Sequence, residues 1–248
     1  MPVHFQQQSA QLLAIFVGKP TTKGSNSATI WHDKPWTSAI HKQPVNQTIQ
    51  LNENNLLGDA QADLKNHGGP HRALLIYPAD HYPYWRKQLN LPTLPYGAFG
   101  ENLTIPHFTE SRVHIGDTFT LGSTIIQASQ PRPPCWKLAR RWKIKNLAIQ
   151  VQNTGFAGWY ARVLQTGTIS PSDTLTLIDR PCPDWSIDTI ARLKYDSTPN
   201  RPEYAQLADC PHLPPYLRDR FAKKHTSPAH SLHHNHDTTP RTHGPNID

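Results

Sequence analysis

One cysteine in a proline-rich stretch is the residue of this chain best suited to chemistry. The stretch SQPRPPCWKL (129–138) places Cys135 directly after three prolines in four residues. Prolines restrict the backbone and remove amide donors, which predicts a thiol presented from a rigid loop. Arg132 and Lys137 flank the cysteine, and nearby positive charge lowers a thiol pKa and favours the thiolate, which attacks electrophiles and binds soft metals. An inert, buried cysteine is the alternative that this stretch alone leaves open.

The excess positive charge of the chain surrounds this cysteine. The formal net charge is +7, and residues 118–172 contain seven Lys and Arg but no Asp or Glu, so the rest of the chain sums to zero. The seven are Arg132, Lys137, Arg140, Arg141, Lys143, Lys145 and Arg162. Such a segment is expected to attract an anion. A solvated helix face and a nucleic-acid surface are the alternatives, although few aromatic residues, Trp136 and Trp142, are interleaved with the cations at 132–145 for base stacking.

Two polar loops contain further candidate site residues. Residues 57–74 read LGDAQADLKNHGGPHRAL, and the pair Gly68-Gly69 would let the backbone approach a ligand closely, beside His67 and Arg72. A tight turn is the alternative explanation for the glycine pair. The second loop is FGENL at 99–103.

Length and composition limit the class of protein. The chain has 248 residues, a low hydrophobic fraction of 36% and 24 prolines, which predicts many short elements joined by loops. No apolar run approaches the roughly 18 residues of a membrane span, and the run at 12–17 is too short for a signal sequence. We therefore expect a cytoplasmic protein without a membrane partner. Cys135, Cys182 and Cys210 form no CxxC pair, which argues against a disulfide framework and a structural zinc site.

Strands are expected to predominate before residue 180. Apolar runs predict strands at 12–17, 73–77, 158–164 and 174–178 and a hairpin over 113–129, so that Cys135 follows the end of an anchored strand. Helices are predicted at 79–89 and 137–152. This pattern favours a mainly β, barrel-like or sandwich-like domain with a few helices.

The composition changes near residue 181. Apolar residues separated by proline-rich turns predict two or three short helices, a small C-terminal helical appendage at 181–225 after a β domain at 1–180. Residues 226–248 contain five histidines among Ser, Thr, Asn and Pro, with too few apolar residues to fold around. They predict a His-rich disordered tail.

Five motifs, in order along the chain, resemble the MOSC domain family of molybdenum-cofactor proteins, and specifically its YiiM-like branch. They are LGDAQADLKNHGGPHRAL (57–74), FGENL (99–103), ESRVHIGD (110–117), QASQPRPPCWKL (127–138) and QNTGFAGWYARVL (152–164). The resemblance implies a MOSC-type β-barrel-like domain that binds a pyranopterin molybdenum cofactor, with Cys135 as the thiolate ligand of molybdenum. The helical appendage, with Trp185 and Ser186, also resembles that branch.

The implied reaction is reduction of N-hydroxylated compounds, including hydroxylamino purines, to amines. The candidate cofactor-binding residues are Arg132, Arg72, Lys137, Gly68, Gly69, Asn102, Asn153 and Thr154. The arginines suit a phosphate or the pterin, and the Asn and Thr side chains suit the polar edges of the pterin. His67 or Asp59 could deliver protons. For all of these except Cys135, a capped turn or a surface ion pair is the alternative.

Electrons are expected to come from a separate reductase. The chain has no GxGxxG loop for a dinucleotide and no cysteine spacing for an iron–sulfur cluster. Two alternatives to a reductase function for this chain itself remain. Cys135 could carry sulfur as a persulfide, or the basic segment could form a nucleic-acid-binding module without catalysis.

Overall fold

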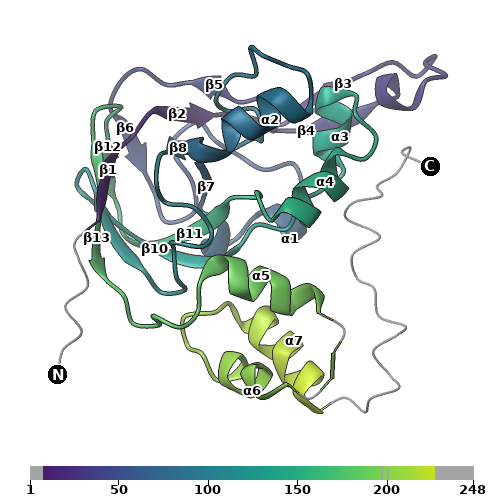
Figure 1. Ribbon diagram of the computed structural model, residues 1–248. Helices are drawn as coiled ribbons and strands as arrows, with labels where there is room; N and C mark the ends of the chain where they lie inside the picture. Colours follow the sequence, from purple (N-terminus) through teal and green to yellow (C-terminus); the bar gives the residue numbers. More distant parts are fainter. Residues whose placement is uncertain (1–7, 197, 200, 227–248) are drawn as a thin grey trace.

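A nine-stranded sheet forms the centre of the protein (Figure 1). The computed structural model describes residues 8–196, 198–199 and 201–226, so the predicted tail lies outside the described residues except for Thr226. In spatial order the strands are β1 (Ser9–Gln11), β13 (Thr174–Asp179), β9 (Thr118–Leu121), β10 (Thr124–Pro131), β11 (Trp159–Gln165), β7 (Leu74–Pro78), β8 (Leu103–Ile105), β2 (Ala14–Val17) and β5 (Gln43–Pro44). Strands β7 and β8 pair in parallel, and the other neighbours pair antiparallel.

The sheet curls toward a barrel without closing. Only two residues separate β1 from β2, yet β1 pairs with β13 (Ser9 opposite Thr176) and β2 pairs with β8 near the other end of the strand order. The chain therefore bridges the two ends of the sheet, while the strand order ends at β1 and β5. The mainly β, barrel-like prediction is confirmed, with an open curled sheet in place of a closed barrel.

Smaller elements surround the sheet. Two-stranded sheets pair β3 (Thr21–Lys23) with β4 (Trp36–Ser38) and β6 (Ile49–Leu51) with β12 (Gly167–Ile169). The helices are η1 (Trp31–Asp33), α1 (Leu64–His67), η2 (Pro70–Arg72), η3 (Ala79–His81), α2 (Tyr82–Gln88), α3 (Lys137–Trp142), α4 (Leu147–Thr154), α5 (Ile187–Tyr195), α6 (Pro202–Ala208) and α7 (Pro215–Thr226). No helix among the described residues is long and apolar enough to span a membrane.

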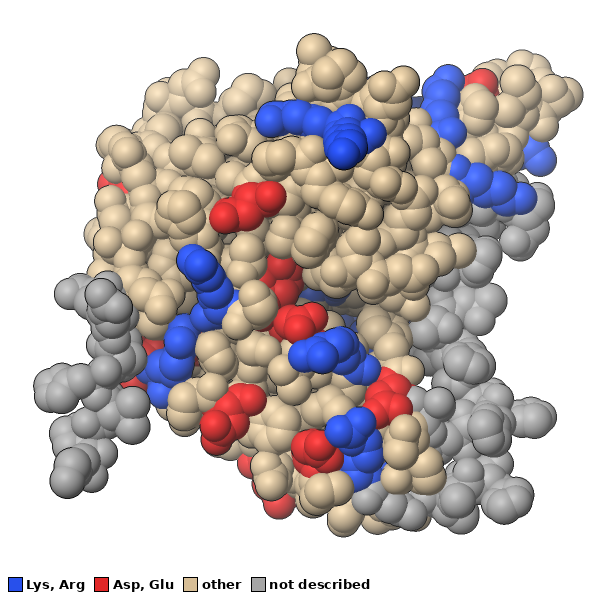
Figure 2. Space-filling view, in the orientation of Figure 1, with Lys and Arg blue, Asp and Glu red and all other residues tan. Residues whose placement is uncertain are grey.

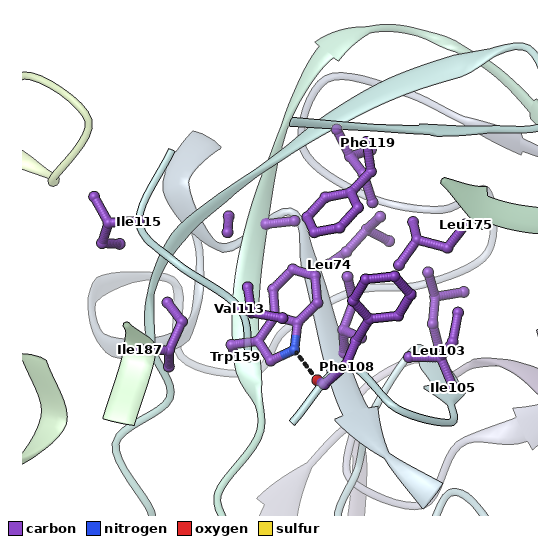
Figure 3. Close-up of a cluster of buried hydrophobic side chains, with 14 of the residues drawn as sticks. Leu74, Leu103, Ile105, Phe108, Val113, Ile115, Phe119, Trp159, Leu175 and Ile187 are labelled. Carbon is purple, nitrogen blue, oxygen red and sulfur yellow. Dashed lines mark hydrogen bonds between the residues drawn. The ribbon is translucent and has the colours of Figure 1, made fainter. Parts of the chain in front are cut away.

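Both faces of the sheet bury apolar side chains. Along β7, Leu74 and Ile76 belong to the larger hydrophobic cluster, whereas Tyr77 belongs to a second cluster with residues of α2, α3 and α4. Alternate side chains of a strand point to opposite faces, which explains this division. In the larger cluster Trp159 stacks on Phe119 with ring centroids 5.6 Å apart, and its indole nitrogen donates a 3.0 Å hydrogen bond to the carbonyl of Phe108 (Figure 3).

The C-terminal helices α5, α6 and α7 group together at one end of the sheet (Figure 1). Helix α5 begins after Ser186, whose hydroxyl accepts a hydrogen bond from the amide of Thr189, a typical N-cap. Ile187, Leu207 and Phe221, one from each helix, belong to the larger hydrophobic cluster of the sheet. Helices are thus present where the appendage was predicted, and its boundaries at 181 and 225 stay a prediction.

The structure corrects one predicted helix. Residues 137–152 form two helices, α3 and α4, because Lys143 adopts the left-handed conformation with φ 57° and ends the first of them. Its amide donates to the carbonyl of Ala139, as at a helix C-terminus. A lysine is uncommon in this conformation, so no residue type marked the break.

Lys224 ties α7 to the end of α5. Its ammonium donates to the backbone oxygens of Leu193 (2.8 Å), Lys194 (2.9 Å) and Asp196, carbonyls that a helix C-terminus leaves unpaired. We expect Lys224→Met to lower the free energy of unfolding by about 1–3 kcal/mol, measured by chemical denaturation. Lys145→Met, at an exposed lysine between α3 and α4, is the matched control, and equal losses in the two variants would contradict the assigned role.

Candidate functional site

A pocket of about 590 Å³, including its mouth, opens beside Cys135. Its lining comes from segments far apart in the sequence: Ser38, Ala39, Ile40, Lys42, Asp59, Ala60, Gln61, Ala62, His67, Arg72, Leu75, Phe99, Gly100, Asn102, Arg132, Cys135, Lys137 and Tyr160. Four of these side chains, Lys42, Arg72, Arg132 and Lys137, are Lys or Arg, and only Asp59 is acidic. The pocket is therefore suited to an anionic ligand.

Cys135 lies between the end of β10 and the start of α3, as predicted. Strand β10 ends at Pro131, and the residue is 9% exposed. Burial raises the pKa of the thiol. A hydrogen bond with His67, the positive charges of His67 and Arg132 and the amide of Lys137 outweigh this effect, so the net result is a pKa lowered to about 7. The surroundings of Cys135 thus favour the thiolate, the form that binds a soft metal.

His67 reaches the thiol from the end of α1. Asp63 caps this helix, accepting a 3.0 Å hydrogen bond from the amide of Asn66, and its carboxylate lies 3.7 Å from Nδ1 of His67. That Nδ1 is buried and has no hydrogen-bond partner within the described residues. The His67 side chain forms a hydrogen bond with the Cys135 thiol, so the structure brings together these two predicted site residues.

The glycine pair reverses the chain between α1 and η2. The amide of Gly68 donates to the carbonyl of Leu64, and a β-carbon on Gly68 would lie 2.9 Å from that oxygen, while Gly69 has φ +96°. This turn puts Arg72 into the pocket wall, where Nη1 donates 3.3 Å to the carbonyl of Gly68. Its Nε is buried and has no hydrogen-bond partner among the described residues, so the guanidinium is only partly paired within the protein.

Arg132 forms part of the pocket wall and is only 6% exposed. Its guanidinium donates to the carbonyls of Ala157 (3.2 Å) and Phe99 (2.9 Å). These bonds fix the arginine between the two segments and keep its charge close to Cys135. The sequence predicted that Arg132 contacts the cofactor, and the structure shows in addition that Arg132 links the segments that contain Phe99 and Ala157.

Asp59 and Asn102 line the pocket but are engaged in internal bonds. Asp59 accepts from the amide of Gly18 (2.8 Å), from Nδ2 of Asn102 (2.9 Å) and from the ammonium of Lys42. Asn102 also donates to the carbonyl of Phe16 and accepts from the amide of Leu75. The Asp59 carboxylate thus accepts three hydrogen bonds within the protein, and both donors of the Asn102 amide are already used, so these side chains connect segments of the pocket wall; their roles as proton donor and pterin contact stay predictions.

Asn153 and Thr154 lie outside the pocket. They are the last residues of α4, and the Thr154 hydroxyl donates to the carbonyls of Gln150 (3.0 Å) and Val151 (3.2 Å) of its own helix. Both line a second hollow with Asp188 and Tyr195 of α5, and Arg132 lies in the walls of both hollows. Asn153 and Thr154 are thus not among the residues that line the pocket with Cys135, and their pterin contacts stay a prediction.

Residues 63–176 match the MOSC domain family. YflK from Bacillus subtilis (strain 168) is 38% identical over 219 residues, which cover 88% of this chain and 96% of that protein. This chain belongs to the MOSC domain family.

Two further comparisons refine the place of this MOSC protein. The crystal structure of YiiM from Geobacillus stearothermophilus superposes with a TM-score of 0.69 at 31% identity, covering 87% of this chain and 99% of that one, which supports the YiiM-like branch. A protein of Gibberella moniliformis (strain M3125 / FGSC 7600) named Reductase is 40% identical over 161 residues, 63% of this chain but 28% of its own length.

Lys42 and Tyr160 also line the pocket, and neither is among the site residues predicted from the sequence. Tyr160 follows Trp159 on β11, so strand alternation turns it away from the core and toward the pocket, a signal available in the sequence. Burial raises its pKa. Lys42 lies 93 residues before Cys135, outside every motif, and only the fold brings it to Asp59.

The basic segment of this MOSC protein is mostly covered. Arg132 and Arg140 are buried, and of the seven cationic residues at 118–172 only Lys143 and Lys145 are exposed. On the face drawn in Figure 2, lysines and arginines are interspersed with acidic residues and form no continuous basic patch. A phosphate backbone needs a row of accessible cations, so this segment is a poor nucleic-acid surface.

Alkylation of Cys135 should follow its lowered pKa. The rate of reaction with iodoacetamide, read at Cys135 by mass spectrometry, is expected to rise with pH through a midpoint of about 7, because only the thiolate reacts. His67→Leu removes a hydrogen bond and a charge that lower this pKa, so the midpoint should move upward. Cys182, where burial and Cys210 raise the pKa to about 12, is the internal control and should react slowly. An unchanged midpoint in His67→Leu would contradict the contact.

Proposed function

We propose that this protein is a molybdenum-cofactor-dependent reductase that removes oxygen from N-hydroxylated compounds, such as hydroxylamino purines, to give amines. The observation that carries the proposal is the Cys135 thiol, with a pKa of about 7, in the wall of a pocket with four Lys and Arg side chains. Membership of the MOSC family and the name of the Gibberella moniliformis relative support oxidoreductase activity.

The residues of the pocket fit the molybdenum cofactor. A thiolate at Cys135 is a soft ligand appropriate for molybdenum, and the flanking prolines limit its movement. Arg72 and Lys137, both cations of the pocket wall, would bind the phosphate of the cofactor. When bound, the cofactor would supply the redox chemistry that removes the oxygen.

The chain's own residues have three tasks in this proposal. Cys135 holds the metal, and the cationic wall orients the anionic part of the cofactor. His67, which contacts the Cys135 thiol, would deliver protons for the reaction. Asp59, paired with Lys42, keeps the pocket wall in place.

A separate reductase would supply the electrons. The chain contains neither a dinucleotide fingerprint nor a spacing for an iron–sulfur cluster. The substrate would be a small N-hydroxylated molecule that enters through the open mouth of the pocket.

Metal and pterin analysis of protein made in a cofactor-producing host tests the proposal. We expect molybdenum and pterin in equal amounts, bound to the purified protein, and reduction of a hydroxylamino purine by chemically reduced holoprotein only. Activity without molybdenum together with a persulfide on Cys135 would instead identify a sulfur carrier. Salt-dependent binding of a short oligonucleotide, with no bound metal, would identify a nucleic-acid-binding module.

A further inference from the structure

The start of α7 reaches the wall of the Cys135 pocket. Tyr216 lies with its ring over the guanidinium of Arg72, whose central carbon is 5.1 Å from the ring centroid. This distance is within the range of a cation–π interaction. A residue of the C-terminal helices therefore contacts a pocket arginine that is encoded 144 positions earlier.

The local sequence holds this tyrosine in place. Pro214 and Pro215 precede it, and a proline at the first helical position fixes where a helix begins. The amide of Leu217 donates to the carbonyl of Pro214 (3.0 Å), and Leu217 is buried in the core. The ring of Tyr216 consequently projects from a rigid helix start, although the residue is 38% exposed.

Hydrogen bonds join the same two segments. The Tyr216 hydroxyl donates to Oε1 of Gln130, and Nε2 of Gln130 donates 3.1 Å to the carbonyl of His71, the residue before Arg72. Arg162 forms a second connection, with Nη2 donating 2.7 Å to the carbonyl of His212 and Nη1 lying 3.2 Å from Nδ1 of His71. Residues 212–216 are thus bound to η2 by two independent routes.

Arg72 itself has little else to orient it. Its described hydrogen bond is a 3.3 Å contact to the carbonyl of Gly68, and its Nε has no partner within the described residues. A flexible arginine loses side-chain entropy when it binds an anion, and a stacked guanidinium loses less because it is already ordered.

We propose that Tyr216 is a positioning residue that holds Arg72 ready to bind the anionic group of the ligand in the Cys135 pocket. The inference rests on the proposed function in one respect, since the anionic group would be the phosphate of the molybdenum cofactor. It gives the C-terminal helices a role in ligand binding. Tyr216 acts through Arg72 and does not touch the reacting atoms.

Two measurements on full-length protein test this role. The first is the Arg72 Nε–H signal in the NMR spectrum of cofactor-free protein, assigned by its loss in Arg72→Ala; the ring above it should shift this signal, and Tyr216→Leu should abolish the shift. The second is the pterin retained per protein after extensive washing, which Tyr216→Leu should lower about fivefold. Tyr216→Phe keeps the ring and loses only the hydrogen bond to Gln130, so it should retain the shifted signal and most of the pterin.

The controls separate positioning from a general loss of structure. Tyr84→Leu, at a tyrosine of α2 that is 41% exposed and outside the pocket, should change neither measurement. In the Arg72→Ala background, Tyr216→Leu should cause no further loss of pterin, because its effect passes through Arg72.

An unshifted Arg72 signal in the wild type, or a further fivefold loss in the double variant, would overturn the inference. A wild-type protein without pterin would count against the proposed function instead, and the Arg72 signal would still decide the role of Tyr216.

Discussion

Replacement of Cys135 by serine or alanine should lower the turnover of a hydroxylamino purine by more than about a hundredfold. Loss of a group that merely supports a metal ligand costs about 10- to 100-fold, and loss of the ligand itself should exceed that range. Initial rates with chemically reduced holoprotein measure the effect, normalised to bound molybdenum so that poor loading is not mistaken for slow chemistry.

Cys182→Ser is the matched control for this experiment. Cys182 is a free cysteine outside the pocket, with its sulfur 4.0 Å from that of Cys210, so its replacement should leave turnover unchanged. Serine at position 135 preserves the size of the side chain and removes only the soft ligand. Wild-type turnover by metal-loaded Cys135→Ser would refute the ligand role.

Replacement of Asp59 by alanine should lower the free energy of unfolding by about 3–5 kcal/mol, because it leaves the buried ammonium of Lys42 without its partner. The Asp59 side chain is fully buried and that of Lys42 is 7% exposed. Burial lowers the pKa of Lys42, and the Asp59 charge opposes that shift. The amide of Gly18 and the Asn102 side chain would also lose an acceptor. Urea denaturation of cofactor-free protein measures the change.

The double variant Lys42→Met/Asp59→Leu distinguishes charge from packing. It removes both members of the buried pair, so it should recover most of the stability that Asp59→Ala loses. Equal losses in the single and double variants would show that the hydrogen bonds of Asp59, and not its pairing with Lys42, determine stability.

The hairpin before Cys135 illustrates what the sequence predicts well. Alternating apolar residues around Gly122 predicted two strands, and β9 and β10 pair there with Leu121 opposite Thr124. Gly122 adopts φ +58°, and a β-carbon would lie 2.3 Å from the carbonyl of Thr168, so this turn requires glycine. Short-range periodicity and turn chemistry thus placed the cysteine at the end of β10, although the strands begin only at Thr118.

The partners of polar side chains were not predictable in the same way. The motifs predicted a shared site for His67, Arg72 and Cys135, and these three residues line one pocket. They also suggested Asn153 and Thr154, but the motif that contains these two residues forms the turn from α4 into β11. In that turn Gly158 has φ +81°, and a β-carbon would lie 2.6 Å from the carbonyl of Ile76. The pairing of Lys42 with Asp59 depends on tertiary packing, for which the sequence carries no local pattern.

The bridge between the two ends of the sheet has a consequence for biosynthesis. Ser9 of β1 pairs with Thr176 of β13, so β1 cannot pair until almost the whole β domain has left the ribosome. At about 5–20 residues per second this interval is roughly 8–33 s, during which β1 lacks its neighbour β13; β9, which is made later, lacks β13 for a shorter time. Completion of the sheet is therefore a late, long-range event, and the nascent chain depends on a slow closing step that local hairpins do not require.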